Sequence, residues 1–253
     1  MRRLARGKSI YGLAALLLAL AATGDDLNGA PDWPTSELHF TRMYYNGGGY
    51  DRGWGGGSWT TDYPEAEEHF GMGVGRLTRV DIGEPRMLQV TDDTIFNYPW
   101  LYAVEVGRWY LDDVEAARLR EYLLRGGFLM TDDFHGSRQW ANFLESMQRV
   151  FPDRPIVDIA DNDEVFHVLY DLDQRIQIPG IYPLRYGQTY EQDGIVPRWR
   201  GIYDDAGRLM VAINFNMDLG DAWEHADDPF YPEAMTGLAY RFAVNYVIYA
   251  MTH

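Results

Sequence analysis

Short apolar runs alternate with longer amphipathic segments along most of the chain, and they predict strands and helices in turn. Runs bounded by turn-forming residues predict six strands, at residues 37–45, 85–90, 99–106, 127–131, 155–159 and 208–214. The first of these alternates apolar and polar side chains, as strands commonly do. The third is almost entirely apolar, so we expect it near the centre of a sheet.

Helical periodicity occurs in four longer segments, at residues 63–77, 113–125, 137–150 and 233–251. The second segment has the clearest ends. Asp112 lies at the N-cap position and Glu115 follows three residues later, which resembles a capping box. Gly126 follows the last turn, where a left-handed residue commonly ends a helix. We therefore expect this helix to be well defined.

The segment between the third and fourth helices has a different character. Residues 160–200 are rich in Pro, Gly and Tyr and predict long loops, with a hairpin near residues 186–200. Elsewhere strands alternate with helices, which predicts an α/β fold with a mainly parallel central sheet. No break in composition divides the chain after its N-terminal part, so we expect a single α/β domain over residues 37–253.

The N-terminus has the features of a secretory signal peptide. Basic residues precede an apolar run at residues 13–22 that ends in small residues, so we expect a signal peptide over residues 1–22. The run is about ten residues, whereas a bilayer span needs roughly 20. An uncleaved N-terminal anchor is the alternative. Residues 23–36 are rich in Gly, Pro and Asp and predict a flexible leader. We expect a periplasmic or secreted protein with no stable membrane span after cleavage.

Composition excludes several classes of function. The 253 residues include no Cys, which excludes disulfides, thiolate metal sites and a cysteine nucleophile. Lys8 is the sole lysine, so cleavage of residues 1–22 leaves no Schiff-base or P-loop lysine. The same cleavage removes four basic residues of 22, and the net charge changes from −16 to −20. A chain this acidic argues against nucleic acid as a partner.

Polar residues follow the predicted strands at the end where parallel sheets bind ligands. Asp132, Asp133 and His135 follow the strand at 127–131 and are candidate catalytic residues. Two carboxylates and an imidazole can bind a divalent metal or transfer protons. In the structural alternative, one Asp caps the following helix and His135 packs against the protein. Further candidate ligand-binding residues at or near strand ends are Arg42, Tyr44, Asn46, Glu105, Asn214, Asn216 and Asp218.

A protein metal site needs about three ligands or more. Additional metal-ligating side chains follow the last predicted strand, at Asn216, Asp218, Asp221, Glu224 and His225. Their spacing matches neither an EF-hand loop nor an HExxH motif, so it predicts no geometry and no metal identity. No serine lies in a G-x-S-x-G motif, which argues against a Ser-His-Asp hydrolase.

The segment at residues 46–59 combines glycines with aromatic residues. It follows a predicted strand and precedes a predicted helix, but it lacks the GK[ST] ending of a phosphate-binding loop. Tyr50, Trp54 and Trp59 predict a mobile aromatic loop that can stack on a sugar ring or another flat ligand. The alternative is a surface loop whose Trp side chains fold back onto the body of the protein.

Several longer segments resemble a known family. They are Phe40–Tyr44, Asp113–Asp133, Asn162–Leu172, Asn216–Glu224 and Asn245–His253. In this order they resemble the bacterial domain-of-unknown-function family 4159, over about residues 37–253. That family is similar in fold to class I glutamine-amidotransferase-like proteins, so the resemblance implies a flavodoxin-like three-layer α/β sandwich. The wider group includes enzymes with a Cys nucleophile, and the lack of Cys here excludes amidotransfer by that route.

Two functions remain open. The first is a non-catalytic binding module of the cell envelope that uses the strand-end crevice and the Gly/Trp/Tyr loop. Its partner would be a saccharide, another cell-envelope ligand or a protein, and some proteins of the wider fold group resemble sugar-utilisation proteins. The second is a hydrolase-like enzyme with Asp132, Asp133 and His135 as acid/base groups or metal ligands. No cofactor is predicted, and a divalent metal bound by these residues is left open.

Overall fold

The structure is a computed structural model and describes residues 34–45 and 58–253. The predicted signal peptide and most of the predicted leader lie outside the described residues. So do Asn46, Tyr50 and Trp54, which the sequence places in the glycine-rich segment. In the described part of the chain, no helix combines the length and apolarity that a membrane span requires.

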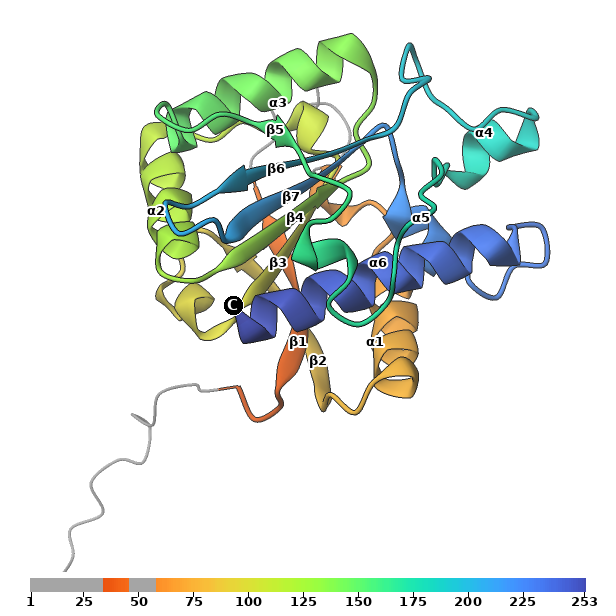
Figure 1. Cartoon of the computed structure of the whole chain (residues 1–253), viewed down its shortest axis with the longest axis horizontal. Helices are drawn as coiled ribbons and strands as arrows, with labels where there is room; N and C mark the ends of the chain where they lie inside the picture. Colours follow the sequence, from red (N-terminus) through yellow and green to blue (C-terminus); the bar gives the residue numbers. More distant parts are fainter. Residues whose placement is uncertain (1–33, 46–57) are drawn as a thin grey trace, which may run out of the picture. The chain divides into compact units, whose positions relative to one another are not determined.

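Seven strands of the described chain form one sheet, in the order β2-β1-β3-β4-β7-β6-β5 (Figure 1). They are β1 (Leu38–Tyr44), β2 (Ile82–Gln89), β3 (Trp100–Val104), β4 (Phe128–Asp132), β5 (Val157–Asp158), β6 (Arg198–Tyr203) and β7 (Leu209–Phe215). In this order, β2, β1, β3, β4 and β7 pair in parallel. The last two strands are antiparallel, since β6 pairs antiparallel with β7 and β5 pairs antiparallel with β6. The prediction of an α/β fold with a mainly parallel sheet is confirmed.

Helices cover both faces of the sheet. They are α1 (Glu65–Leu77), α2 (Asp113–Leu124), α3 (Gly136–Val150), α4 (Ile181–Arg185), α5 (Leu219–Glu224) and α6 (Glu233–Thr252). Helices α2 and α3 lie on one face of the sheet, and α1, α5 and α6 lie on the other (Figure 1). Apolar side chains of each group form a core with the face that the group covers. The result is a three-layer α/β sandwich, as predicted.

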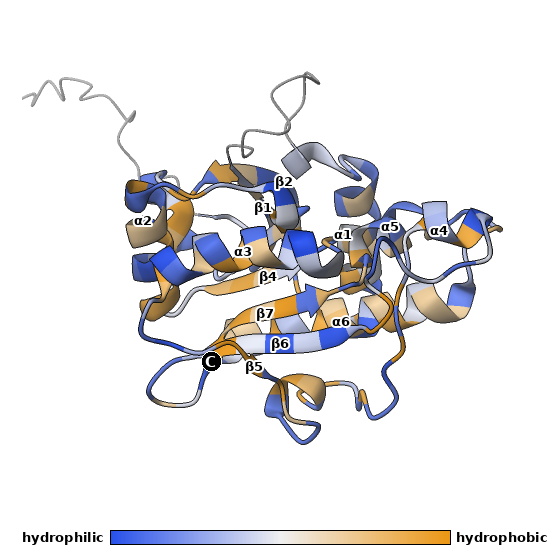
Figure 2. Cartoon of the chain, turned by 90° about the horizontal axis from the view of Figure 1, so that it is seen from above, coloured by the Kyte–Doolittle hydropathy of each residue, from blue (hydrophilic) through white to orange (hydrophobic). Residues whose placement is uncertain are grey.

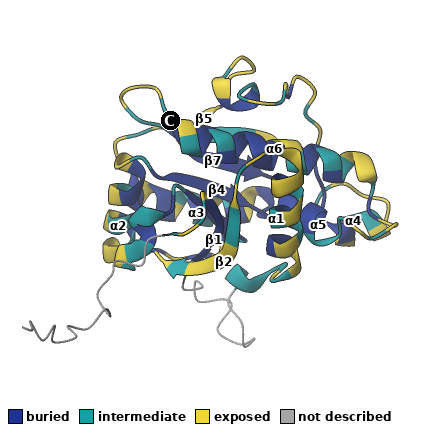
Figure 3. Ribbon diagram, turned by 90° about the horizontal axis from the view of Figure 1, so that it is seen from below, coloured by how far each residue is buried: buried dark blue, intermediate teal, exposed yellow. Residues whose placement is uncertain are grey.

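The central strands are buried along their whole length. Every residue of β3, β4 and β7 is buried. Figure 3 shows β4 and β7 in dark blue, the colour of buried residues. Figure 2 shows β7 as hydrophobic over most of its length, as expected for a strand covered by helices on both faces. The edge strand β2 is mostly exposed, and it contains Pro85, which edge strands tolerate.

The ends of α2 follow the sequence prediction. The Asp112 side chain accepts hydrogen bonds from the backbone N–H groups of Val114 and Glu115, at 2.9 and 2.8 Å. The Glu115 side chain accepts one from the Asp112 N–H at 2.9 Å, which completes a capping box. Gly126 has a φ of 111°, a backbone conformation that favours glycine, just beyond the last turn.

The structure differs from the sequence prediction in the last third of the chain. The predicted hairpin near residues 186–200 is instead formed by β6 and β7. Its turn is stabilised by Asp204 Oδ1, which accepts hydrogen bonds from the N–H groups of Ala206 and Arg208. The helices α4 and α5 were not predicted, because five and six residues are too few to show a helical period.

Candidate functional site

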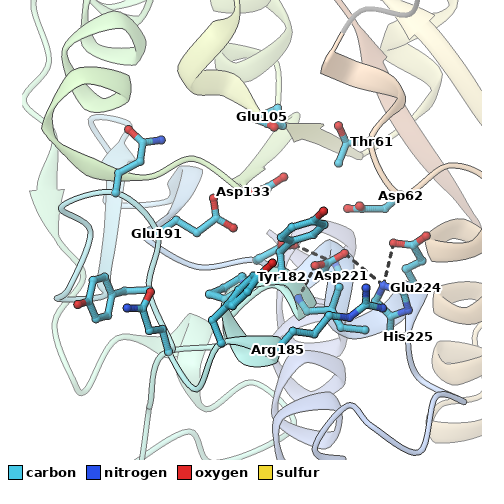
Figure 4. Close-up of a pocket in the computed structure, with 17 residues that line it drawn as sticks. Thr61, Asp62, Glu105, Asp133, Tyr182, Arg185, Glu191, Asp221, Glu224 and His225 are labelled. Carbon is cyan, nitrogen blue, oxygen red and sulfur yellow. Dashed lines mark hydrogen bonds and ion pairs between the residues drawn. The ribbon is translucent and has the colours of Figure 1, made fainter.

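A cleft of about 710 Å³ opens at the edge of the sheet where the parallel strands end (Figure 4). Among the described residues, seven carboxylates line it: Asp62, Glu105, Asp133, Glu191, Asp218, Asp221 and Glu224. The cationic and potentially cationic side chains in the lining are Arg185 and His225. Tyr182 of α4 and Tyr186, the residue after α4, also line the cleft, and both side chains are largely exposed. The cleft is therefore strongly acidic with an aromatic border.

Strained backbone concentrates around this cleft. Five non-glycine residues of the described chain have positive φ angles of 48–64°: Asp62, Glu105, Asp133, Gln192 and Asn216. The first four line the cleft, and Asn216 lies two residues before Asp218. Such conformations cost roughly 1–3 kcal/mol each and are enriched at functional sites. Three of these residues follow β3, β4 and β7, so the chain turns sharply at the end of three neighbouring strands.

Asp132 is a structural residue at the floor of this region. It is fully buried, and its Oδ2 accepts hydrogen bonds from the N–H groups of Leu219 and Gly220, at 2.7 and 3.0 Å. Burial and the nearby Asp133 charge raise the pKa of Asp132 to about 8, although these backbone hydrogen bonds oppose the rise. Asp132 therefore caps α5, which lies far from it in the sequence. In the structural alternative from the sequence, an Asp caps the helix that directly follows, α3, and Asp132 does not do so. It does not line the cleft.

Asp133 and His135 form a hydrogen-bonded pair, with 3.1 Å between Asp133 Oδ1 and His135 Nε2. Burial acts to lower the pKa of His135, but the hydrogen bond and the charge of Asp133 outweigh it and raise the pKa. His135 is 3% exposed, whereas Asp133 lines the cleft. Of the three candidate catalytic residues, Asp133 is the one that a ligand in the cleft would contact.

Arg42 does not line the cleft. Its fully buried side chain donates from Nε to Glu67 and from Nη1 to the carbonyl oxygens of Trp59 and Thr61, at 3.0 and 2.9 Å. These bonds hold the segment that leads into Asp62. The structure therefore gives Arg42 a positioning role, where the sequence suggested ligand contact.

Tyr44 and Trp59 pack against each other, with ring centroids 4.7 Å apart in an edge-to-face arrangement. Trp59 also packs against the core on the α2 and α3 side. For this Trp the structure agrees with the alternative in which the side chain folds back onto the protein. Neither residue lines the cleft.

The predicted asparagines serve the scaffold. Asn214 is fully buried and its Oδ1 accepts a hydrogen bond from the Tyr246 hydroxyl at 2.9 Å. Asn216 Oδ1 accepts from the Gly136 N–H at 2.9 Å, and its Nδ2 donates to the Val196 carbonyl at 2.7 Å. Both asparagines fasten loops and helices to the sheet, and neither lines the cleft.

Two other predicted residues do reach the cleft. Glu105 lines it and forms an ion pair with Arg108 at 3.0 Å. Asp218 is 4% exposed, and its Oδ1 accepts a hydrogen bond from the Asp221 N–H at 2.8 Å, so it is the N-cap of α5. Of the residues that the strand-end rule selected, Glu105, Asp133 and Asp218 therefore line this cleft.

Asp62 and Glu191 were not predicted as site residues. Asp62 follows the glycine-rich segment and precedes α1, and it reaches the cleft because Arg42 holds the preceding residue. Glu191 belongs to the long loop after α4 that crosses the strand ends. No local pattern marks either residue, because their positions depend on contacts between distant segments.

Burial and mutual repulsion raise the pKa of several cleft carboxyl groups. For Asp62 and Asp218 the pKa lies well above its ordinary value, because the charges of Asp133 and Asp221 add to the effect of burial. Burial and a hydrogen bond with Asp221 raise the pKa of Glu224 to about 7. Near neutral pH the cleft therefore favours bound protons or another source of positive charge.

Two groups of side chains in the cleft have the spacing of metal ligands. One oxygen each from Asp62, Asp218 and Asp221 lie within 4.8 Å of one another. The same holds for one ligand atom each from Asp221, Glu224 and His225, so the two groups share Asp221. Several of these side chains belong to the set that the sequence named as additional metal ligands.

Comparison with known proteins identifies a family. None of the curated proteins matches the chain. A family model described as "Domain of unknown function (DUF4159)" matches residues 39–251, which is most of the chain and nearly all of the sandwich. The sequence resemblance is thereby confirmed, and the chain belongs to the DUF4159 family of domains of unknown function.

Proposed function

We propose that the protein is an exported ligand-binding module of the cell envelope, and that its strand-end cleft binds a ligand carrying positive charge. The observation that supports this most directly is the lining of the cleft, where seven carboxylates face Arg185 and His225. Export rests on the predicted signal peptide over residues 1–22.

Electrostatic repulsion gives a positive ligand its advantage. Oxygens of Asp62, Asp218 and Asp221 lie within 4.8 Å of one another. Two unit charges no farther apart than this repel by about 3.5 kcal/mol or more at an effective dielectric constant of about 20. A cation removes this repulsion, and it also displaces the protons that the raised pKa values retain. Binding is therefore expected to release protons and to weaken as the pH falls.

The aromatic border favours an organic cation. Tyr182 and Tyr186 are 67% and 76% exposed, and their ring centroids are 6.4 Å apart. An ammonium group binds favourably over the face of a tyrosine ring. Carboxylates beside the ring accept hydrogen bonds from the same ammonium group. Tyr50 and Trp54 of the glycine-rich loop, to which the sequence interpretation gave this stacking role, lie outside the described residues. An amine-bearing ligand, including an amino sugar, suits this lining better than a neutral saccharide.

A matched pair of saccharides tests the proposal. Isothermal titration calorimetry would compare glucosamine, which is cationic, with neutral N-acetylglucosamine, and would include spermidine as a polycation. We expect the two cations to bind and Glu191→Gln to weaken them several-fold. The control Asp173→Asn removes an exposed carboxylate that does not line the cleft, and it should leave binding unchanged. Equal binding of the two saccharides, or no binding of either cation, would contradict the proposal.

The Asp133–His135 hydrogen bond favours hydrolysis as a second candidate function. A carboxylate at the cleft surface with an imidazole behind it can act as a general acid or base. In this version Asp133 would touch the substrate, and His135 would orient it. NMR spectra of a bound ligand during prolonged incubation would test this. New product signals that are lost in Asp133→Asn would support hydrolysis, and an unchanged ligand would exclude hydrolysis of that compound.

A further inference from the structure

We propose that a divalent cation, of the size and ligand preference of Ca²⁺, binds between Asp62, Asp218 and Asp221. This rests on the proposed function, because it names one positive charge that the acidic cleft accepts. Carboxylate oxygens are the preferred ligands of hard divalent cations, and a set with no nitrogen or sulfur favours Ca²⁺, Mg²⁺ or Mn²⁺ over Zn²⁺.

The spacing of the three carboxylates agrees with shared coordination. One oxygen of each lies within 4.8 Å of the other two. Oxygens on opposite sides of a Ca²⁺ ion are at most about 5 Å apart, since each lies about 2.3–2.6 Å from the ion. A Mg²⁺ ion demands stricter octahedral geometry and is usually held by only one or two carboxylates together with several waters. The cluster therefore suits the larger and more tolerant ion.

An unpaired carboxylate oxygen provides an independent indication. Asp62 Oδ2 is shielded from solvent and has no hydrogen-bond partner among the described residues. A buried carboxylate oxygen without a donor is costly, unless a proton or a cation compensates it. Figure 4 shows the Asp62 and Asp221 side chains on the same side of the cleft. The unmet acceptor therefore lies within the proposed ligand set.

The backbone leaves room for the converging carboxylates at Gly180. A Cβ atom at this position would lie 2.7 Å from Asp218 Oδ2 and 2.9 Å from Asp221 Oδ2. It would also lie 3.4 Å from Glu191 Oε1, so three carboxylate oxygens surround one small volume. The substitution Gly180→Ala would push the two Asp ligands aside without changing any charge.

The ligands are held in place before any ion binds. The Asp62 carbonyl accepts a hydrogen bond from the Ala66 N–H at 2.9 Å, and Asp218 donates from its N–H to the Ile178 carbonyl at 2.9 Å. Asp221 Oδ2 accepts from the Ile181 N–H at 2.6 Å. Preorganised ligands of this kind raise metal affinity, because less conformational entropy is lost on binding.

The neighbouring group of Asp221, Glu224 and His225 is the weaker candidate. His225 Nε2 already lies 3.4 Å from Glu224 Oε2 and 3.7 Å from Asp221 Oδ1, so these side chains partly compensate one another. Each of the three is also partly exposed. The oxygen-only group has the greater unmet need for a cation.

Calorimetry on the full chain, freed of metal with EDTA, tests the site with CaCl₂, MgCl₂ and ZnCl₂ as separate titrants. We expect one Ca²⁺ per chain and weaker Mg²⁺ binding. Asp62→Asn should weaken Ca²⁺ at least tenfold, and Gly180→Ala should weaken it by a similar factor at unchanged net charge. Asp173→Asn is the control with an altered charge outside the cleft. Thermal unfolding of each metal-free variant would verify that it folds.

Three results would overturn the metal site. They are no Ca²⁺ binding to the wild-type chain, Ca²⁺ binding that survives both substitutions, and Ca²⁺ binding that requires His225 but tolerates Asp62→Asn. The glucosamine and spermidine titrations keep the two proposals apart. If these amines bind and Ca²⁺ does not, the metal site alone is refuted, whereas failure of all cations refutes the proposed function as well.

Discussion

Replacing Arg42 with Met is expected to destabilise the protein by about 3–5 kcal/mol. The Arg42 side chain is 0% exposed and the side chain of its ion-pair partner Glu67 is 1% exposed. Met fills a similar volume, but it leaves the Glu67 carboxylate without a cation in a site that water does not reach. Domains have roughly 5–15 kcal/mol of stability in total, so the loss is a large and measurable fraction.

The double variant Arg42→Met/Glu67→Met isolates the electrostatic part of this loss. It buries no charge, and it retains the apolar contacts beside Phe40 and Tyr102, whose ring centroids lie 5.7 and 5.2 Å from the Arg42 guanidinium carbon. The double variant still lacks the guanidinium group that donates hydrogen bonds to two backbone carbonyl groups. The loss of these hydrogen bonds costs about 1–3 kcal/mol. We therefore expect the double variant to be more stable than Arg42→Met alone.

Urea unfolding, followed by Trp fluorescence, would measure all four proteins of this double-mutant cycle. Arg198→Met is a suitable control, because Arg198 pairs with Asp158 at 3.7 Å on the surface and should contribute less than about 1 kcal/mol. If the losses in the two single variants simply add in the double variant, the pair is not coupled and the reasoning is wrong. The double variant should also bind cations more weakly, because the segment before Asp62 loses its anchor.

Three further predictions concern pH and individual contacts. Burial raises the pKa of Asp132 to about 8, and it also raises the pKa of neighbouring carboxyl groups in the cleft. The folded state therefore retains protons that the unfolded state releases. The stability of the metal-free protein should therefore fall between about pH 4 and pH 8, and urea unfolding that showed a rise would refute this. Asp112→Ala should cost about 1 kcal/mol of unfolding free energy through loss of the capping box, and Asp113→Ala is the control beside it. Tyr246→Phe should cost about 1–3 kcal/mol because it leaves the buried Asn214 Oδ1 without its donor, and Asn214→Leu in the same chain should recover part of that loss.

Local patterns were sufficient for most of the secondary structure. Strands and helices of adequate length show their period in the sequence, and the capping box of α2 is formed by residues three positions apart. The location of the cleft was also predictable, since ligands bind at the carboxyl ends of parallel strands. That rule placed Glu105, Asp133 and Asp218 in the cleft from their positions after strands alone.

The roles of neighbouring residues could not be predicted in this way. Asp132 and Asp133 are adjacent in the chain, yet the first caps α5 and the second lines the cleft. Asp132 is the last residue of β4, whereas Asp133 has a positive φ just beyond the strand, so the two side chains point in different directions and meet different segments. The α5 backbone that Asp132 caps begins 87 residues later, so no local pattern reveals this contact.

Residue patterns along the chain are therefore enough to predict the fold class, the family and the edge of the sheet at which the cleft lies. The tertiary structure decided which carboxylates meet there. Asp62 and Glu191 come from segments far from the strand ends in the sequence, and the buried Arg42 holds the residue before Asp62. Periodicity reports on neighbours a few positions apart, whereas burial, charge repulsion and metal-ligand spacing arise between segments that only folding brings together.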